Sequence, residues 1–163
     1  VETSSGPLGQ GISQAVGMAL AGKLDKKRYH IFCISSDGEH NEGQLWESLL
    51  AAAKYKLNNL INIVDRNNIQ IDGYTKDIMP LEPLEKKYLA FGWRVLEING
   101  HNIKQIVSTL KKAKNTKNKP TVIIANTTMG KGVDFMENKY VWHGKAPKPE
   151  EAKKALEQLQ NAI

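Results

Sequence analysis

The sequence lacks the features that mark disulfide-stabilised and membrane-spanning proteins. Its 163 residues include a single cysteine, Cys33, so no internal disulfide can form, and we expect this thiol in the core of a protein from a reducing compartment. No apolar run approaches the roughly 20 residues needed to cross a bilayer. The opening residues "VETSSGPLGQ" contain neither the basic nor the apolar stretch of a secretory signal. These absences predict a cytoplasmic protein without a membrane partner.

Aromatic residues are also scarce, at 7%, and they are not interleaved with the basic residues. The net charge of +6 comes from lysines spread along the chain and from the tract "KKAKNTKNK". Because a nucleic-acid-binding surface combines basic with aromatic side chains, we expect no nucleic-acid partner. We expect most of this charge to be solvated, with a modest attraction for phosphorylated small molecules.

Length and composition are those of an ordinary globular domain. Hydrophobic residues make up 40% of the chain and charged residues 25%. A chain of 163 residues is long enough to bury one continuous core and too short to be expected to hold two. We therefore predict one domain over residues 1–163.

Apolar patterns alternate between strand and helix along the chain. Short apolar runs predict buried strands at residues 29–35, 59–65, 93–98 and 119–128. Helical spacing predicts helices at residues 9–24, 42–57, 81–90, 102–115 and 149–162. This alternation is typical of an α/β fold, a mainly parallel sheet with helices on both faces. Ligands bind outside the carboxyl ends of such strands, so the loops to consider are 35–42, 65–73 and 126–145.

Two of these loops carry oxygen ligands. Asp37 follows one predicted strand, in "SSDGEHNE", and Asn67 follows the next, so both are expected at the same edge of the sheet. Carboxylate and amide oxygens suit Mg²⁺ or Ca²⁺. Gly38 leaves a bare amide for an anionic oxygen, near the positive end of the following helix. Alternatively, Asp37 caps that helix and Asn67 forms an Asx turn.

Several motifs together resemble one enzyme family. "SDGEHNEG" through "NNLINIVDRNNIQIDG" resembles the thiamine diphosphate signature, in which GDG is followed by asparagine after the next strand. "NNIQIDG" is similar to the transketolase version of this signature rather than the pyruvate dehydrogenase version. "TSSGPLGQGISQAVGMALA", "TTMGKG" and "VWHGKAP" are also similar to transketolase. The chain is thus identified as a member of the transketolase family from Thr3 to about Pro147.

The resemblance implies a domain that binds the diphosphate of thiamine diphosphate. Mg²⁺ or Ca²⁺ would be held by Asp37, Asn67 and the backbone carbonyl of Ile69. The amide of Gly38 would meet the diphosphate. Ser36 stands where the signature has its first glycine, and Arg66 stands where transketolases commonly have an acid.

The resemblance also implies contacts to the rest of the cofactor and to the substrate. Gly6 and Leu8 would line the ring region of the cofactor, and Met129 would pack near the thiazolium. His143 would lie near the diphosphate and the donor sugar. Glu42 would contact the cofactor-activating acid of a partner domain at the subunit interface.

The reaction implied is transfer of a two-carbon ketol unit from a ketose phosphate to an aldose phosphate, in the pentose phosphate pathway. The resemblance implies that the chain is truncated at its amino terminus relative to the family and that the pyrimidine-binding domain, with its activating glutamate, is expected on another polypeptide. We therefore expect a split transketolase, in which this chain is inactive alone. Its partner would be the carboxyl-terminal, pyrimidine-domain subunit, in a homodimer or heterotetramer.

Two alternatives remain open from the sequence. One is a fragment of 1-deoxyxylulose-5-phosphate synthase or of a dehydrogenase E1 component. The other is a non-catalytic remnant that binds thiamine diphosphate or only assembles with partners. Lys131 could reach toward substrate or be solvated. Glu39 is expected in solvent and His40 without a role.

Overall fold

The structure is a computed structural model that describes residues 1–161. The chain divides into two compact units, each described by itself. The sheet unit comprises Val1–Arg66 and Leu81–Thr127, and the small unit comprises Asn67–Pro80 and the chain from Thr128 onward. The prediction that residues 1–163 form a single domain stays a prediction.

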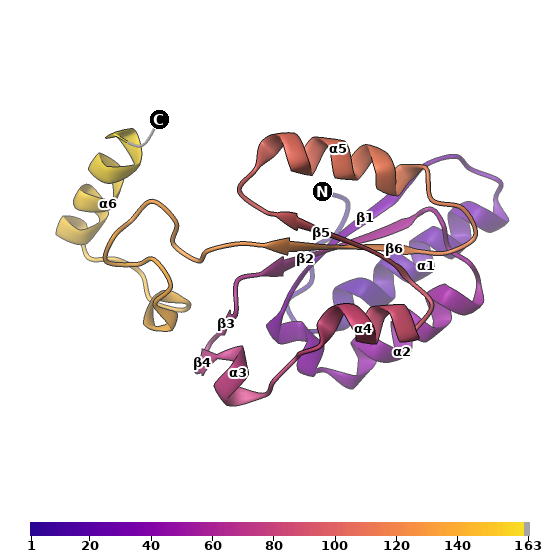
Figure 1. Cartoon of the computed structure of the whole chain (residues 1–163), viewed down its shortest axis with the longest axis horizontal. Helices are drawn as coiled ribbons and strands as arrows, with labels where there is room; N and C mark the ends of the chain where they lie inside the picture. Colours follow the sequence, from indigo (N-terminus) through magenta and orange to yellow (C-terminus); the bar gives the residue numbers. More distant parts are fainter. Residues whose placement is uncertain (162–163) are drawn as a thin grey trace. The chain divides into compact units, whose positions relative to one another are not determined.

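A four-stranded parallel sheet forms the centre of the sheet unit. Its strands are β1 (Ile31–Ser36), β2 (Leu60–Arg66), β6 (Thr121–Asn126) and β5 (Arg94–Asn99), in that spatial order (Figure 1). Ser36 is in register with Asp65, and Arg66 and Asn99 are both in register with Asn126. The carboxyl ends of all four strands therefore meet at one edge. The predicted α/β fold with a parallel sheet is confirmed.

Helices cover both faces of this sheet, as predicted. On one face lie α1 (Gln10–Leu24), α2 (Gly43–Lys54) and α4 (Leu84–Ala90), and on the other lies α5 (Ile103–Lys114) (Figure 1). The larger hydrophobic cluster lies beneath the first three helices, and its largest fully buried members are Trp93, Tyr88, Ile12, Leu45 and Leu49. A smaller cluster beneath α5 includes Ile61, Ile98 and Ile123.

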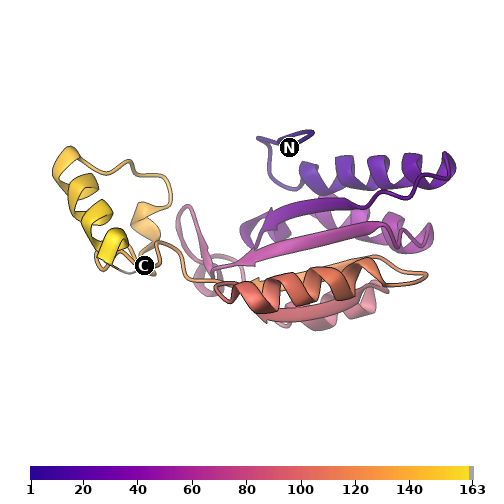
Figure 2. The same ribbon diagram turned by 90° about the horizontal axis from the view of Figure 1, so that it is seen from above.

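The edge strand β1 is buried on one face only, where the sequence predicted a fully buried strand. Cys33 and Ser35 are buried, whereas Phe32 and Ile34 are 46% and 76% exposed. Phe32 and Ile34 are exposed because α5, the helix that covers this face of the sheet, contacts β5 and β6 (Figure 2). Cys33 lies in the core as expected, and burial raises the pKa of its thiol to about 11.

The small unit is built from two stretches of chain. In the first, β3 (Ile69–Gln70) and β4 (Gly73–Tyr74) form an antiparallel hairpin that leads into α3 (Thr75–Ile78). These short elements were not predicted. The second contains η2 (Tyr140–Trp142) and the predicted closing helix, α6 (Pro149–Asn161). The predicted end of that helix at residue 162 lies outside the described residues.

Hydrogen bonds order the long loop within the small unit. Tyr74 donates its hydroxyl to the carbonyl of Asn138 at 3.0 Å, and Trp142 donates its indole N–H to the carbonyl of Phe135 at 2.9 Å. The backbone N–H of Asp134 donates to Gln158 of α6 at 2.9 Å.

In residues 1–161 no helix combines the length and apolarity needed to span a bilayer.

Candidate functional site

The loop between β1 and α2 places Asp37 at the carboxyl edge of the sheet. It opens a short 3-10 helix, η1 (Gly38–Asn41), and its backbone N–H donates to the carbonyl of Asp65 at the end of β2. The side chain of Asp37 is fully buried. Its carboxylate does not cap η1, although helix capping was the structural alternative for this residue.

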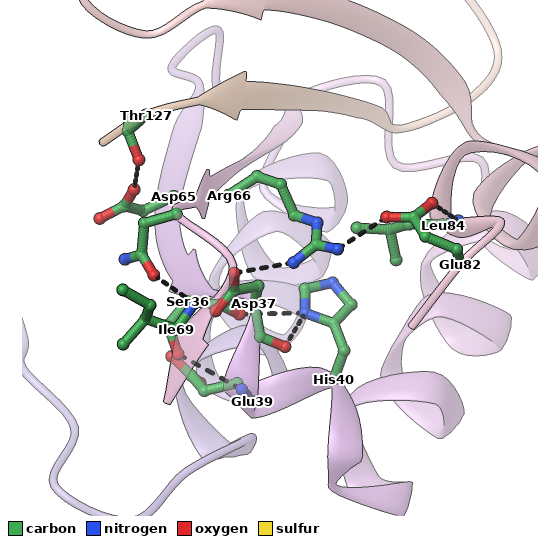
Figure 3. Close-up of polar contacts among 11 residues, drawn as sticks. Ser36, Asp37, Glu39, His40, Asp65, Arg66, Ile69, Glu82, Leu84 and Thr127 are labelled. Atoms are coloured by element: carbon green, nitrogen blue, oxygen red, sulfur yellow. Dashed lines mark hydrogen bonds and ion pairs between the residues drawn. The ribbon is translucent and has the colours of Figure 1, made fainter. Parts of the chain in front are cut away.

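Arg66, the last residue of β2, is the charged partner of Asp37. Its Nη1 lies 2.9 Å from Oδ2 of Asp37, and its Nη2 lies 2.7 Å from Oε1 of Glu82 (Figure 3). The hydrogen bond from Arg66, followed by one from the N–H of Leu84, lowers the pKa of Glu82. The sequence marked Arg66 only as a departure from the family pattern, and its partner Glu82 was missed.

His40 is a buried, hydrogen-bonded residue that supports the same loop, which agrees with the expectation that it has a structural place and no role in the chemistry. Burial lowers the pKa of His40 to about 4, against backbone hydrogen bonds that raise it, so the ring is neutral. Nδ1 is 3.0 Å from the carbonyl of Ser36 and 3.2 Å from that of Asp37, so we assign the ring proton to Nδ1. Nε2 then accepts from the hydroxyl of Tyr88 at 2.8 Å, and Asn62 donates to that hydroxyl at 3.0 Å.

Glu39 was expected in solvent, but its carboxylate connects the loop to the start of α1. One oxygen accepts from the N–H of Gly9 at 3.0 Å and the other from the N–H of Ser36 at 3.1 Å. Gly9 has a φ of 76°, and a Cβ there would lie 2.7 Å from Cβ of Glu42. Glycine is therefore required at the point where the amino-terminal segment meets this loop.

Five of the predicted site residues belong to the sheet unit. Asp37 is buried and Gly38, the first residue of η1, is half-buried. Gly6, Leu8 and Glu42 are exposed, and a Cβ added to Gly6 would meet nothing within 4 Å. Glu42 stands at the amino terminus of α2, next to Gly9.

The other four predicted residues belong to the small unit. Oδ1 of Asn67 accepts from the N–H of Ile69 at 2.9 Å, which is the Asx turn considered for this residue. Ile69 is buried and Met129 is half-buried. His143 is exposed, and its backbone N–H donates to the backbone carbonyl of Tyr140 at 2.8 Å.

The chemistry of the predicted metal ligands suits a hard cation. Asp37 offers a buried carboxylate at the end of β1, Asn67 directly follows β2 in the chain, and Ile69 offers a backbone carbonyl. All three donors are oxygens, the ligands that Mg²⁺ and Ca²⁺ prefer. Within residues 1–161 no cluster of three or more His, Cys, Asp or Glu could hold a metal. The predicted set includes a single carboxylate.

Comparison with known proteins gives one consistent family. Residues 1–161 match the family model described as "Transketolase, thiamine diphosphate binding domain". A subunit of the apulose-4-phosphate transketolase of Phocaeicola vulgatus is 41% identical over 163 residues, which cover 100% of this chain and 58% of that protein. The 6-deoxy-6-sulfo-D-fructose transketolase subunit SqwG of a Clostridium species is 46% identical, over 98% of this chain and 58% of its own length.

Solved structures agree with the sequence matches. Transketolase from Campylobacter jejuni superposes with a TM-score of 0.91 at 38% identity, over 98% of this chain and 26% of that one. A Pichia stipitis transketolase, crystallised with sedoheptulose-7-phosphate, gives 0.86 at 31% identity, over 95% and 24%. The chain spans 58% of the length of the bacterial subunits that it matches.

Proposed function

The chain belongs to the transketolase family as a thiamine diphosphate-binding domain, and from this premise we propose that it anchors the cofactor of a split transketolase. The assembled enzyme would transfer a two-carbon ketol unit from a ketose phosphate to an aldose phosphate. One observation carries the proposal: the buried carboxylate of Asp37 stands at the carboxyl edge of a sheet that matches this family. The names of the bacterial relatives, as transketolase subunits, support the split arrangement.

The proposed ligands of the divalent cation, Mg²⁺ or Ca²⁺, are Asp37, Asn67 and the backbone carbonyl of Ile69. The amide of Gly38 would donate to the diphosphate, which the cation also binds. When bound, thiamine diphosphate supplies the electronic stabilisation needed to break and form a carbon–carbon bond. The residues of this chain bind the cofactor and orient it.

The remaining predicted residues are proposed to contact the ring end of the cofactor, the sugar and the partner. Gly6 and Leu8 would line the ring region, with Met129 near the thiazolium. His143, exposed on the long loop, would contact the diphosphate and the donor sugar. Glu42, exposed at the start of α2, would contact the cofactor-activating acid of the partner.

We propose that this partner is a pyrimidine-domain subunit, in a homodimer or heterotetramer in the cytoplasm, with this chain inactive alone. The pentose phosphate pathway stays a prediction, because the relatives are named for apulose-4-phosphate and for 6-deoxy-6-sulfo-D-fructose. What those names share is a sugar that carries an anionic group. We therefore propose an anionic ketose as the donor.

Isothermal titration calorimetry of the isolated chain with thiamine diphosphate tests the anchor. We expect binding with Mg²⁺ and none in EDTA. Asp37→Asn, which keeps the side chain's size, should weaken Mg²⁺-dependent binding by at least roughly tenfold, because the only carboxylate of the proposed metal set is lost. Asp25→Asn, an exposed acid after α1, is the matched control and should bind like the parent.

Failure of the parent chain to bind thiamine diphosphate with Mg²⁺ would reject the anchor role. Equal affinity of parent and Asp37→Asn would reject Asp37 as a ligand. Once the pyrimidine-domain partner is present, ketol transfer between sugar phosphates is expected. Pyruvate consumption instead would favour a 1-deoxyxylulose-5-phosphate synthase or a dehydrogenase.

A further inference from the structure

We propose that Arg66 is a built-in counter-cation for Asp37. In the absence of metal it would balance the charge of this buried carboxylate and hold it in place, and it would lower the affinity of the site for a divalent cation. The inference rests on the proposed function, because it takes Asp37 as the metal ligand. Arg66 would thereby help to set the affinity of the cofactor site for its divalent cation.

The first observation is the burial of the pair. Nη1 of Arg66 lies 2.9 Å from Oδ2 of Asp37, and the two side chains are 7% and 0% exposed. A carboxylate removed from water needs a cationic partner or strong hydrogen bonds to stay ionised. Arg66 provides such a partner from the adjacent strand, without any bound ion (Figure 3).

The second observation is that Arg66 is held at both ends of its guanidinium group. Nη2 lies 2.7 Å from Oε1 of Glu82, while Oε2 of Glu82 accepts from the backbone N–H of Leu84 at 3.0 Å. A planar guanidinium can donate to two carboxylates at once, which the point charge of a lysine does less well. Glu82 therefore fixes Arg66 in the position where it contacts Asp37.

The charges of Asp37, Arg66 and Glu82 together determine how strongly this group of side chains attracts a metal ion. Arg66 contributes one positive charge and the two carboxylates contribute two negative charges, which leaves a net negative charge. A divalent cation is therefore still attracted, but less than it would be by the two carboxylates without Arg66. A carboxylate has two oxygens with about four lone-pair sites, so the contact between Arg66 and Oδ2 does not prevent Asp37 from binding a metal.

A bound dication and Arg66 would both lie on the same carboxylate and would repel each other. Arg66 would therefore weaken metal binding while stabilising the metal-free chain. Replacing it with a neutral residue should reverse both effects. The metal-free chain should lose stability, and the metal should recover it.

The first measurement is thermal unfolding of Arg66→Gln. In EDTA its midpoint should fall by roughly 10 °C relative to the parent, because Asp37 is left as a buried charge without Arg66. With saturating Mg²⁺ and thiamine diphosphate, most of this difference should disappear. Arg28→Gln removes the same charge from an exposed loop and is the matched control, with a midpoint near that of the parent.

The double variant Asp37→Asn/Arg66→Gln separates charge from packing, and it remains informative if Arg66→Gln fails to fold. Because both buried charges are removed together, its midpoint in EDTA should lie well above that of Arg66→Gln and within a few degrees of the parent. A double variant no more stable than Arg66→Gln would mean that Arg66 acts through packing. That result would overturn the inference.

The second measurement is calorimetric titration of Mg²⁺ at saturating thiamine diphosphate. Arg66→Gln should bind Mg²⁺ roughly tenfold more tightly than the parent, whereas Arg66→Lys, which keeps the charge, should stay close to the parent. Unchanged Mg²⁺ affinity in Arg66→Gln, with a parent that binds normally, would overturn this inference and leave the proposed function standing. A parent without Mg²⁺-dependent cofactor binding would reject the proposed function, and this inference with it.

Discussion

His40 shows how a single buried side chain can fix the position of a loop. Both ring nitrogens are engaged, one with the backbone carbonyls of Ser36 and Asp37 and the other with the hydroxyl of Tyr88. Protonation of Nε2 would replace an acceptor by a second donor facing that hydroxyl, in a site with little access to water. The fold therefore stabilises the neutral ring.

The preference of the fold for a neutral His40 makes the free energy of unfolding depend on pH. The pKa of His40 is lowered from its ordinary 6.5 to about 4. Between these values the unfolded chain binds a proton that the folded chain does not, so the free energy of unfolding falls as the pH falls. The slope from this residue should be about 1.4 kcal/mol per pH unit across the window. Above pH 6.5 the contribution is fully present.

Urea unfolding between pH 4.5 and 7.5, in EDTA, measures this slope. His40→Gln should lose the contribution and show a flatter dependence, while His101→Gln, on an exposed turn, should keep the slope of the parent. Parallel curves for the parent and His40→Gln would contradict the role given to His40.

The residues around Asp37 also show what the sequence can predict. A strand followed by Asp-Gly placed Asp37 at the carboxyl edge, because the chain direction fixes where the loop falls. The environment of that loop depends on partners distant in the chain. Tyr88, which contacts His40, and Glu82, which contacts Arg66, come from the segment around α4, and no local pattern brings them there. Arg66 was therefore visible only as an unusual residue.

The helix α5 has a start that is encoded by residues close to it in the sequence. Oδ1 of Asn102 accepts from the N–H of Gln105 at 3.0 Å, and the side chain of Gln105 accepts in turn from the N–H of Asn99 at 2.9 Å. Asn102→Ala should lower the free energy of unfolding by about 1 kcal/mol, because a backbone N–H of the first turn loses its acceptor. Asn102→Asp keeps the acceptor and is the matched control.

Chemical denaturation of the two Asn102 variants checks this prediction. Equal losses in both would indicate that the amide nitrogen of Asn102, rather than its oxygen, matters. The same local logic explains why the predicted start of this helix at residue 102 agrees with the structure, in which Asn102 is the cap and Ile103 the first helical residue.

The edge strand β1 shows where such local reasoning stops. Ile31 to Ile34 form a continuous apolar run, which predicts burial on both faces. Phe32 and Ile34 are nevertheless exposed, because burial of that face depends on which strands α5 covers. The sequence contains the strand and its hydrophobicity, but the extent of a neighbouring layer is a property of the tertiary structure.

Across the whole molecule, the two units differ in what stabilises them. Within residues 1–161, both hydrophobic clusters consist of residues of the sheet unit. The strands of the small unit are two residues each, and many of its ordering contacts are single hydrogen bonds in a long loop. Amides in such segments open at a lower free energy than those of a packed sheet. The central strands β2 and β6 should therefore exchange most slowly with solvent deuterium, and the small unit fastest.

Binding of the cofactor should change this ranking. Four proposed contacts, Asn67, Ile69, Met129 and His143, belong to the small unit, so a bound cofactor would stabilise segments that open easily without it. At a free concentration about 100 times the dissociation constant, ligand binding stabilises the bound form by about 2.7 kcal/mol, which corresponds to roughly 100-fold slower exchange.

Hydrogen–deuterium exchange with and without Mg²⁺ and thiamine diphosphate would measure this slowing at residues 67–80 and 128–161. Asp37→Asn, in the sheet unit, should reduce this slowing by at least roughly tenfold at the same cofactor concentration, because the metal that anchors the diphosphate would be held more weakly. Unchanged exchange in the small unit of a parent chain that binds the cofactor would show that these four residues do not contribute.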